Sequence, residues 1–392
     1  MSEDKLTEDL EKEIIQELSA CMKCHLCNMF CPTVDNRVTQ GSFGINRAIY
    51  YGLKWDEFSP NLRDLVYSCT TCGKCEIMCA KVSRALPLRR LIEKTREYLL
   101  VEKMLGPMPE QTSVLKNMYV RGNPWGKPSH ERTKWVDKLE VTFASKENPV
   151  DLLYFVGCAS SYDSYGQKIA KNLVKIFQAA NIHFGILENE SCSGHEARRM
   201  GEVALGEYLA DENIKMFEAA GIRNIVTGDP HSFYTLSKEY ADRGGKLNVQ
   251  HYTQFLNDII DQGKLILSKK IEKKVTYHDP CYLGRHSGVF DAPRELIKRI
   301  PGIFFKEIEN NKELSDCCGM GGGRMWMEPP KKLTSSQVIA ERRVHQAIET
   351  GAEVLLTACP FCNIALNDAV KAMGKQDSIE VMDLACMVAM AV

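Results

Sequence analysis

The cysteines of the C-terminal part of the chain lie in three short segments: YHDPCYLGRH (277–286), CCGMGGGR (317–324) and ACPFC (358–362). Together they form the pattern C-x35-CC-x40-CxxC, and Pro280, Gly319 and Pro360 adjoin its cysteines. Packing of a hydrophobic core does not require adjacent cysteines, whereas thiolates that converge on one soft metal centre do. We therefore interpret this segment as an iron–sulfur site.

Two further cysteine runs lie near the N-terminus, at CMKCHLCNMFCP (21–32) and CTTCGKCEIMC (69–79). Both have the spacing CxxCxxCxxxC of bacterial two-cluster ferredoxins, in which the fourth cysteine of each run binds the other cluster. This pattern predicts one cubane 4Fe–4S cluster on Cys21, Cys24, Cys27 and Cys79, and a second on Cys69, Cys72, Cys75 and Cys31. Two zinc sites are the alternative, because paired cysteines also suit zinc.

The composition is that of an ordinary globular protein. The chain has 392 residues, a net charge of −1 and 16 cysteines, so nucleic acid is not expected as a partner. The acidic N-terminus is unlike a signal peptide, and no apolar run reaches the roughly 18 residues that span a bilayer. Cysteines without an export signal favour metal ligands over disulfides. We expect a cytoplasmic protein, which a partner subunit could hold at the membrane face.

The spacing of apolar residues divides the chain into four parts. Residues 1–105 read as a helical ferredoxin module, and residues 106–150, which are rich in glycine and proline, as a connector. Strands and helices then alternate over 151–268 and again over 269–392, which predicts parallel sheets covered by helices. Predicted strands are 152–156, 225–227, 275–278 and 354–357; predicted helices are 6–20, 46–51, 62–68, 86–100, 232–240, 292–300, 335–349 and 362–373.

The two α/β halves also repeat their cysteine positions. Cys158 corresponds to Cys281, the segment CSG (192–194) to CCG (317–319), and DPHS (229–232) to CPFC (359–362). The first half keeps two of the five thiols, so we expect that it does not hold the same cluster. Cys158 and Cys192 could bind zinc with His195 or His231, or remain free thiols.

These motifs resemble the CCG-domain iron–sulfur family, which includes the B/D group of heterodisulfide reductase subunits. The resemblance covers nearly the whole chain and implies an α+β and α/β multidomain fold, with a ferredoxin module followed by two CCG domains. It implies a noncubane 4Fe–4S cluster on Cys281, Cys317, Cys318, Cys359 and Cys362. In heterodisulfide reductase two such clusters face each other and split a disulfide; the incomplete first site argues against that mechanism here.

The resemblance further implies an electron-transfer subunit of an anaerobic multisubunit oxidoreductase, such as a benzoyl-CoA reductase complex. A terminal disulfide reductase, or the iron–sulfur subunit of a membrane quinone oxidoreductase, is the alternative. The expected partner is a flavin or iron–sulfur electron-transfer subunit, or a membrane cytochrome b-type subunit. The chain has no nucleotide-binding fingerprint, so we expect no flavin or nucleotide of its own. No catalytic residue is assigned.

Several other residues near the motifs have two interpretations. Gly319, Gly321, Gly322 and Gly323 could bring backbone N–H groups close to the cluster, or could serve only a tight turn. His195, His231 and His278 could donate protons or could be buried, hydrogen-bonded histidines. The apolar tail 384–392, which contains Cys386, is predicted to be a helix docked on the core or on a partner.

Overall fold

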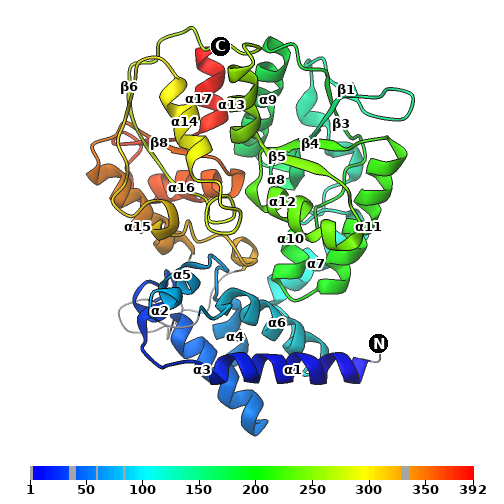
Figure 1. The fold of residues 1–392 in the computed structure, drawn as a ribbon, viewed down its shortest axis with the longest axis vertical. Helices are drawn as coiled ribbons and strands as arrows, with labels where there is room; N and C mark the ends of the chain where they lie inside the picture. The colour runs from blue at the N-terminus through cyan, green and yellow to red at the C-terminus, as the bar shows by residue number, and fades with distance from the viewer. Residues whose placement is uncertain (1–2, 35–40, 59–60, 83–84, 328–335) are drawn as a thin grey trace.

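The computed structural model describes residues 3–34, 41–58, 61–82, 85–327 and 336–392. A helical module lies at one end of the molecule, and two α/β domains lie side by side above it (Figure 1). The predicted fold class is confirmed. Within the described residues, no helix is both long and apolar enough to cross a membrane.

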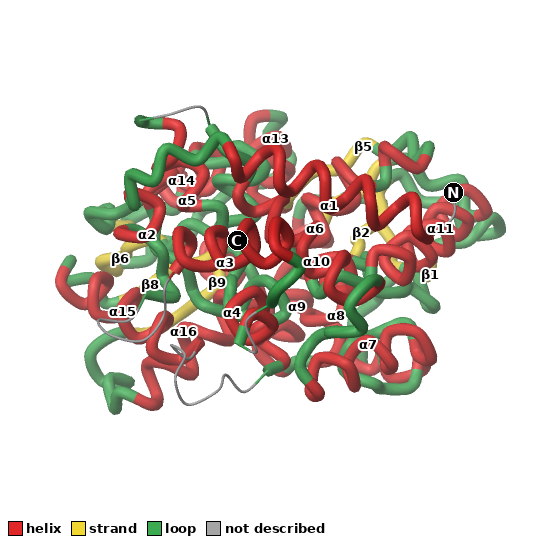
Figure 2. The backbone as a smooth tube through the Cα atoms, turned by 90° about the horizontal axis from the view of Figure 1, so that it is seen from below, coloured by secondary structure: helices red, strands yellow, loops and turns green. Residues whose placement is uncertain are grey.

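The helical module owes its core to the apolar faces of three long helices. Leu10, Ile14 and Leu18 pack against Ile49 and Leu99, and the helices cross one another in the view from below (Figure 2). A 3–4 residue spacing places such side chains on one helix face. The helices are α1 (Glu3–Ser19), α2 (Leu26–Met29), α3 (Gly41–Trp55), α4 (Leu62–Tyr67), α5 (Lys74–Ala80) and α6 (Leu88–Val101).

The first α/β domain contains a five-stranded parallel sheet in the order β1-β3-β2-β4-β5. Its central strands are short apolar runs buried on both faces, as expected for a covered parallel sheet. The strands are β1 (Thr142–Phe143), β2 (Leu152–Phe155), β3 (Phe184–Ile186), β4 (Asn224–Thr227) and β5 (Asn248–His251). The helices are α8 (Gly157–Tyr162), α9 (Ser164–Ala179), α10 (His195–Arg199), α11 (Val203–Ala219), α12 (Pro230–Tyr234) and α13 (Tyr252–Asp261).

The second α/β domain contains a four-stranded parallel sheet in the order β7-β6-β8-β9. This order repeats β3-β2-β4-β5, so the sequence repeat is also a repeat of topology. The strands are β6 (Lys273–Tyr277), β7 (Ile303–Phe305), β8 (Val354–Thr357) and β9 (Glu380–Asp383). The helices are α14 (Asp291–Arg299), α15 (Ser336–Glu349), α16 (Pro360–Ala372) and α17 (Leu384–Ala391).

The two α/β domains share one hydrophobic core. Leu173 of α9, Leu256 of α13, Leu296 of α14 and Val388 of α17 belong to the same buried cluster. The tail helix α17 is therefore docked on the core, as one of the two alternatives predicted. Cys386 on this helix is buried and accepts a hydrogen bond from Asn172 Nδ2 at 3.3 Å.

Among the predicted segments, the connector at residues 106–150 differs most from the structure. It contains a helix, α7 (Pro109–Arg121), and the edge strand β1, which pairs with β3. Trp135 is only 2% exposed and lies in the core shared by the α/β domains. The predicted helix 232–240 begins at Pro230 and continues from Thr235 to Glu239 as a π-helix. The first residue of the predicted helix 335–349 lies outside the described residues.

Candidate metal centres

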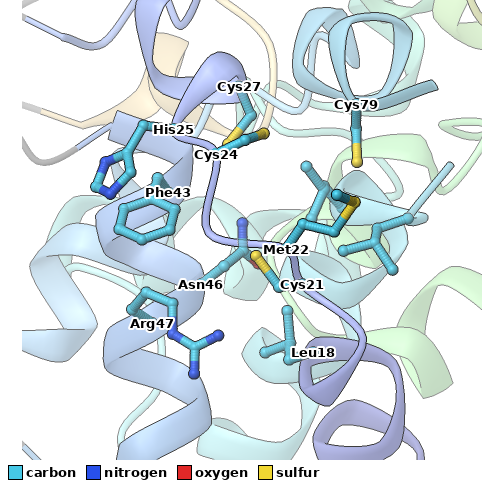
Figure 3. Close-up of a pocket in the computed structure, with 12 residues that line it drawn as sticks. Leu18, Cys21, Met22, Cys24, His25, Cys27, Phe43, Asn46, Arg47 and Cys79 are labelled. Carbon is cyan, nitrogen blue, oxygen red and sulfur yellow. The ribbon is translucent and has the colours of Figure 1, made fainter. Parts of the chain in front are cut away.

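The first group of cysteines borders a pocket in the helical module. Cys21, Cys24 and Cys27 come from the first run, and Cys79 reaches the pocket from α5 (Figure 3). Lys23 and His25 have left-handed backbones, with φ of 59° and 62°, which turn the loop around the pocket. The pocket has about 490 Å³ of empty space and a largely apolar wall that includes Leu18 and Leu88. Four thiols around one such space fit a cubane cluster.

The second group borders a pocket of similar size, about 410 Å³. It consists of Cys31 from the first run with Cys69, Cys72 and Cys75 from the second. Burial raises the pKa of Cys69 to about 12 and that of Cys75 well above its ordinary value. A thiolate in such a place requires a cation beside it, which is what a cluster iron supplies. Both groups therefore have the composition that the ferredoxin spacing predicts.

All five cysteines of the second α/β domain are buried and lie together. Cys281 follows β6, Cys359 is the N-cap residue of α16, and Cys362 lies in the first turn of that helix. Cys281 and Cys317 belong to one buried cluster, and the thiol of Cys362 donates to Cys318 at 3.4 Å. Because carboxyl ends of neighbouring parallel strands meet at one edge, the ends of β6 and β8 bring distant cysteines to one place.

The loop that carries Cys69 and Cys72 lies directly against this five-cysteine site. Cys72 packs in the same buried cluster as Cys281 and Cys317. Arg285 Nε donates to the carbonyl oxygen of Cys72 at 2.8 Å, and the Tyr282 hydroxyl lies 3.1 Å from Thr71 Oγ1. The second pocket and the five-cysteine site are therefore neighbours, fixed to each other by contacts between modules.

The glycine segment after Cys318 has two different environments. Gly319 has φ of +93°, and its N–H donates to Cys317 Sγ at 3.3 Å; its contact with a cluster stays a prediction. A Cβ at Gly321 would lie 2.5 Å from the carbonyl oxygen of Thr70, and one at Gly322 would lie 2.4 Å from that of Cys69. A Cβ at Gly323 would meet Met200. Glycine at positions 321, 322 and 323 therefore allows neighbouring parts of the chain to approach closely. The approach of their backbone N–H groups to a cluster stays a prediction.

The incomplete site of the first domain contains a guanidinium group. Arg132 donates to Cys158 Sγ from Nη1 and Nη2, both at 3.6 Å, and also to Glu190. Cys192 donates to Cys158. Burial would raise the pKa of Cys158, but Cys192 and Arg132 together lower it. Arg132 therefore supplies the positive charge beside these thiols.

Neither His195 nor His231 groups with the thiols of Cys158 and Cys192 as a further metal ligand. His195 Nδ1 lies 3.1 Å from Thr235 Oγ1, and His231 Nδ1 lies 3.1 Å from Asp229 Oδ1. The structure thus favours free thiols over a zinc site at Cys158 and Cys192. No local signal in the sequence indicates Arg132, which lies in the connector, far from any cysteine motif.

His231 instead faces the five-cysteine site of the other domain. One of its ring nitrogens lies within 4.8 Å of the Cys359 sulfur, and its ring centroid lies 4.8 Å from that of Phe361. Burial would lower the pKa of His231, but the Asp229 carboxylate and Cys359 raise it well above the usual range. Burial would raise the pKa of Cys359, but hydrogen bonds from Cys362 and His231 bring it to about 7. The first domain thus contributes a histidine to the second domain's site.

Comparison with known proteins agrees with this architecture. A family profile described as a 4Fe-4S dicluster domain matches residues 15–82, and one described as a cysteine-rich domain, CCG, matches residues 152–237 and 275–367. Fold and site thus define an iron–sulfur protein with a dicluster ferredoxin module and paired CCG domains.

A more specific assignment comes from full-length relatives. The D-type subunit of the dihydromethanophenazine:CoB–CoM heterodisulfide reductase of Methanosarcina barkeri is 32% identical over 401 residues, which are 95% of this chain and 94% of that protein. The chain therefore belongs to the family of heterodisulfide reductase D-type subunits, which are CCG-domain iron–sulfur proteins, as the motifs predicted.

Other relatives are longer. The EtfAB:quinone oxidoreductase of Syntrophomonas wolfei is 35% identical over 332 residues, which are 82% of this chain and 46% of that protein. The chain spans about half the length of two of the oxidoreductases that it matches. A solved structure of a hypothetical protein from Helicobacter pylori has a TM-score of 0.52 at 10% identity, covers 100% of this chain and 76% of its own, and shows the fold alone.

Proposed function

We propose that this chain is an electron-transfer subunit that holds two cubane clusters and one noncubane cluster in series. The observation that carries the proposal is the packing of Cys72 in one buried cluster with Cys281 and Cys317, which joins thiols of two neighbouring cysteine groups. The ligand sets are those given above for the three groups. The clusters would supply one-electron carriers, and the chain's own contribution is to hold them close together.

The order of the cysteine groups supports a path between the surface and the interior of the protein. The first pocket is the outermost, because Cys24 is exposed whereas the five cysteines of the CCG site are buried. Leu88 lines both the first and the second pocket, so one side chain separates them. An external electron carrier would therefore meet the first pocket, and the CCG site would lie at the inner end.

The partner in this proposal is a flavin or iron–sulfur subunit, or a membrane cytochrome b-type subunit, in a hetero-oligomeric oxidoreductase complex. Two relatives support this choice through their names, which describe one as the D-type subunit of a reductase and another as an EtfAB:quinone oxidoreductase. In this proposal the chain carries no flavin of its own and remains at the cytoplasmic face.

The iron content of the purified protein tests the cluster assignment. About twelve irons per chain are expected, since each of the three clusters holds four. Cys317→Ser should lower the content to about eight and remove one cluster's electron paramagnetic resonance signal, leaving the two cubane signals. Cys386→Ser, which changes a buried thiol on α17 away from the sites, is the matched control and should keep about twelve.

Two results would contradict the assignment. A wild-type content of about eight irons would mean that the CCG site holds no four-iron cluster. Loss of all three signals in Cys317→Ser would show that the groups are not independent centres.

A second candidate is a disulfide reductase that acts at the noncubane cluster. It is favoured by the match over 94% of the D-type subunit of a heterodisulfide reductase and by the position of His231 beside Cys359. Reduced protein mixed with a coenzyme heterodisulfide distinguishes the two functions. Rapid cluster reoxidation by the isolated chain would support the reductase, whereas reoxidation that requires another component of the complex would support the relay.

A further inference from the structure

His278 is a buried histidine that lies beside the five-cysteine site without being part of the predicted ligand set. It follows β6, and its backbone N–H donates to the carbonyl oxygen of Leu356 at 2.8 Å, which extends the sheet pairing. One ring nitrogen of His278 and the sulfur atoms of Cys318 and Cys362 all lie within 4.8 Å of one another.

The proton position on this ring follows from its other neighbour. Arg343 Nε donates to His278 Nδ1 at 3.1 Å. A guanidinium group has donors and no acceptor, so Nδ1 must offer its lone pair. A neutral ring then carries its proton on Nε2. Among the described residues, Nε2 of His278 is buried and has no hydrogen-bond partner.

Arg343 is itself held firmly, so it cannot easily turn away from the ring. Its side chain is fully buried on α15. Nη1 donates to the carbonyl oxygen of Asn310 at 2.9 Å and to Gln346 Oε1 at 2.8 Å, and Nη2 donates to Ser315 Oγ at 3.1 Å. These contacts hold Nε of Arg343 against Nδ1 of His278, and this donor fixes the tautomer of the neutral ring.

We propose that His278 donates a hydrogen bond from Nε2–H to a sulfur of the cluster on Cys318 and Cys362, and thereby raises its reduction potential. This inference rests on the proposed cluster assignment. A nitrogen that carries a proton has no lone pair for iron, so His278 is a positioning residue and not a ligand. A hydrogen bond to cluster sulfur stabilises the more negative, reduced form.

Replacement of the donor tests the proposal. His278→Phe removes the N–H group and keeps an aromatic ring, so iron should remain at about twelve per chain. In a redox titration followed by electron paramagnetic resonance, the equilibrium constant for one-electron reduction of the noncubane cluster should fall at least tenfold. This equals a shift of about 59 mV to more negative potential.

Three comparisons show whether the shift comes from the lost donor. His278→Gln retains an amide N–H near the position of Nε2 and should recover at least half of the shift. The two cubane potentials are an internal control and should not move. His345→Phe, at an exposed position of α15, should behave as wild type. An unshifted potential in fully loaded His278→Phe, or equal shifts in the Phe and Gln variants, would overturn the role of His278.

A second measurement, which keeps His278, decides the matter even if His278→Phe fails to assemble the cluster. Protein labelled with nitrogen-15 histidine, in a His231→Gln background that removes the histidine beside Cys359, should show a weak nitrogen coupling to the noncubane cluster in pulsed electron paramagnetic resonance. A coupling as strong as that of a directly bound nitrogen, or none, would overturn the proposal. Failure of the cluster assignment is distinguishable, because the wild type would then hold only about eight irons.

Discussion

Arg132→Met is expected to destabilise the protein by about 3–5 kcal/mol, the usual cost of removing one partner of a buried ion pair. Arg132 is only 3% exposed, and it pairs with Glu190, which is 5% exposed. Glu190 also accepts the backbone N–H groups of Val156 and Gly157 at 2.8 and 2.9 Å. The variant would leave this carboxylate and the Cys158 thiol buried without a positive charge.

Guanidinium chloride unfolding followed by circular dichroism measures this loss. Arg121→Met, at an exposed position of α7, is the matched control and should change stability by less than about 0.5 kcal/mol. The double variant Arg132→Met with Glu190→Gln should be more stable than the single variant, because it removes the unpaired charge. A single variant as stable as the control, or a double variant less stable than the single one, would contradict a charge role for Arg132.

This cluster of Arg132, Glu190 and Cys158 explains how the first domain keeps its fold with only two of the five thiols. In the second domain the corresponding position is occupied by five buried cysteines that need cations. In the first, Ser232 Oγ donates to Asp229 Oδ2 at 2.8 Å, so polar groups bond to one another where thiols would bind iron. Side chains of the protein thus supply the charge and the hydrogen bonds that the incomplete site needs without a cluster.

The spacing of the cysteines predicted the residues of the metal sites more completely than the pattern of apolar residues predicted the helices and strands. Ligand spacing is a local property, since Cys21, Cys24 and Cys27 lie within seven residues of sequence, as do Cys69, Cys72 and Cys75. The repeat then related Cys158 to Cys281 because both follow the first central strand of their sheets. Both features are local in the amino-acid sequence and need no knowledge of distant contacts.

The features that sequence reasoning missed depend on distant parts of the chain. Strand β1 has two residues and β3 has three, and β3 contains Gly185, so local propensity does not indicate either strand. Their pairing with each other and with β2 forms them. The role of Arg132 likewise depends on a contact with Glu190, 58 residues later, which no motif indicates.

The other large effect is expected at Arg96 of α6, which is fully buried and joins all three modules. Nη2 donates to the carbonyl oxygens of Val66 and Cys69 in the helical module, at 2.9 and 2.8 Å. Nη1 donates to that of Arg199 in the first α/β domain at 2.5 Å, and to that of Gly322 in the second at 2.9 Å. One side chain thus fixes the loop of the second pocket against both CCG domains.

Arg96→Met should therefore lower stability by several kcal/mol, because each buried carbonyl left unsatisfied costs about 1–3 kcal/mol. It should also slow electron transfer from the cubane clusters to the noncubane cluster more than it changes any cluster's iron content, since the thiols are untouched and only the docking is lost. Stopped-flow reduction, followed at the noncubane cluster, measures that rate. Arg90→Met is the matched control on the same helix, since Arg90 is exposed and lies 3.9 Å from Glu13. Equal stability and equal rates in the two variants would contradict the argument, because the contact between Cys72 and Cys317 would then persist without the residue that holds the three modules together.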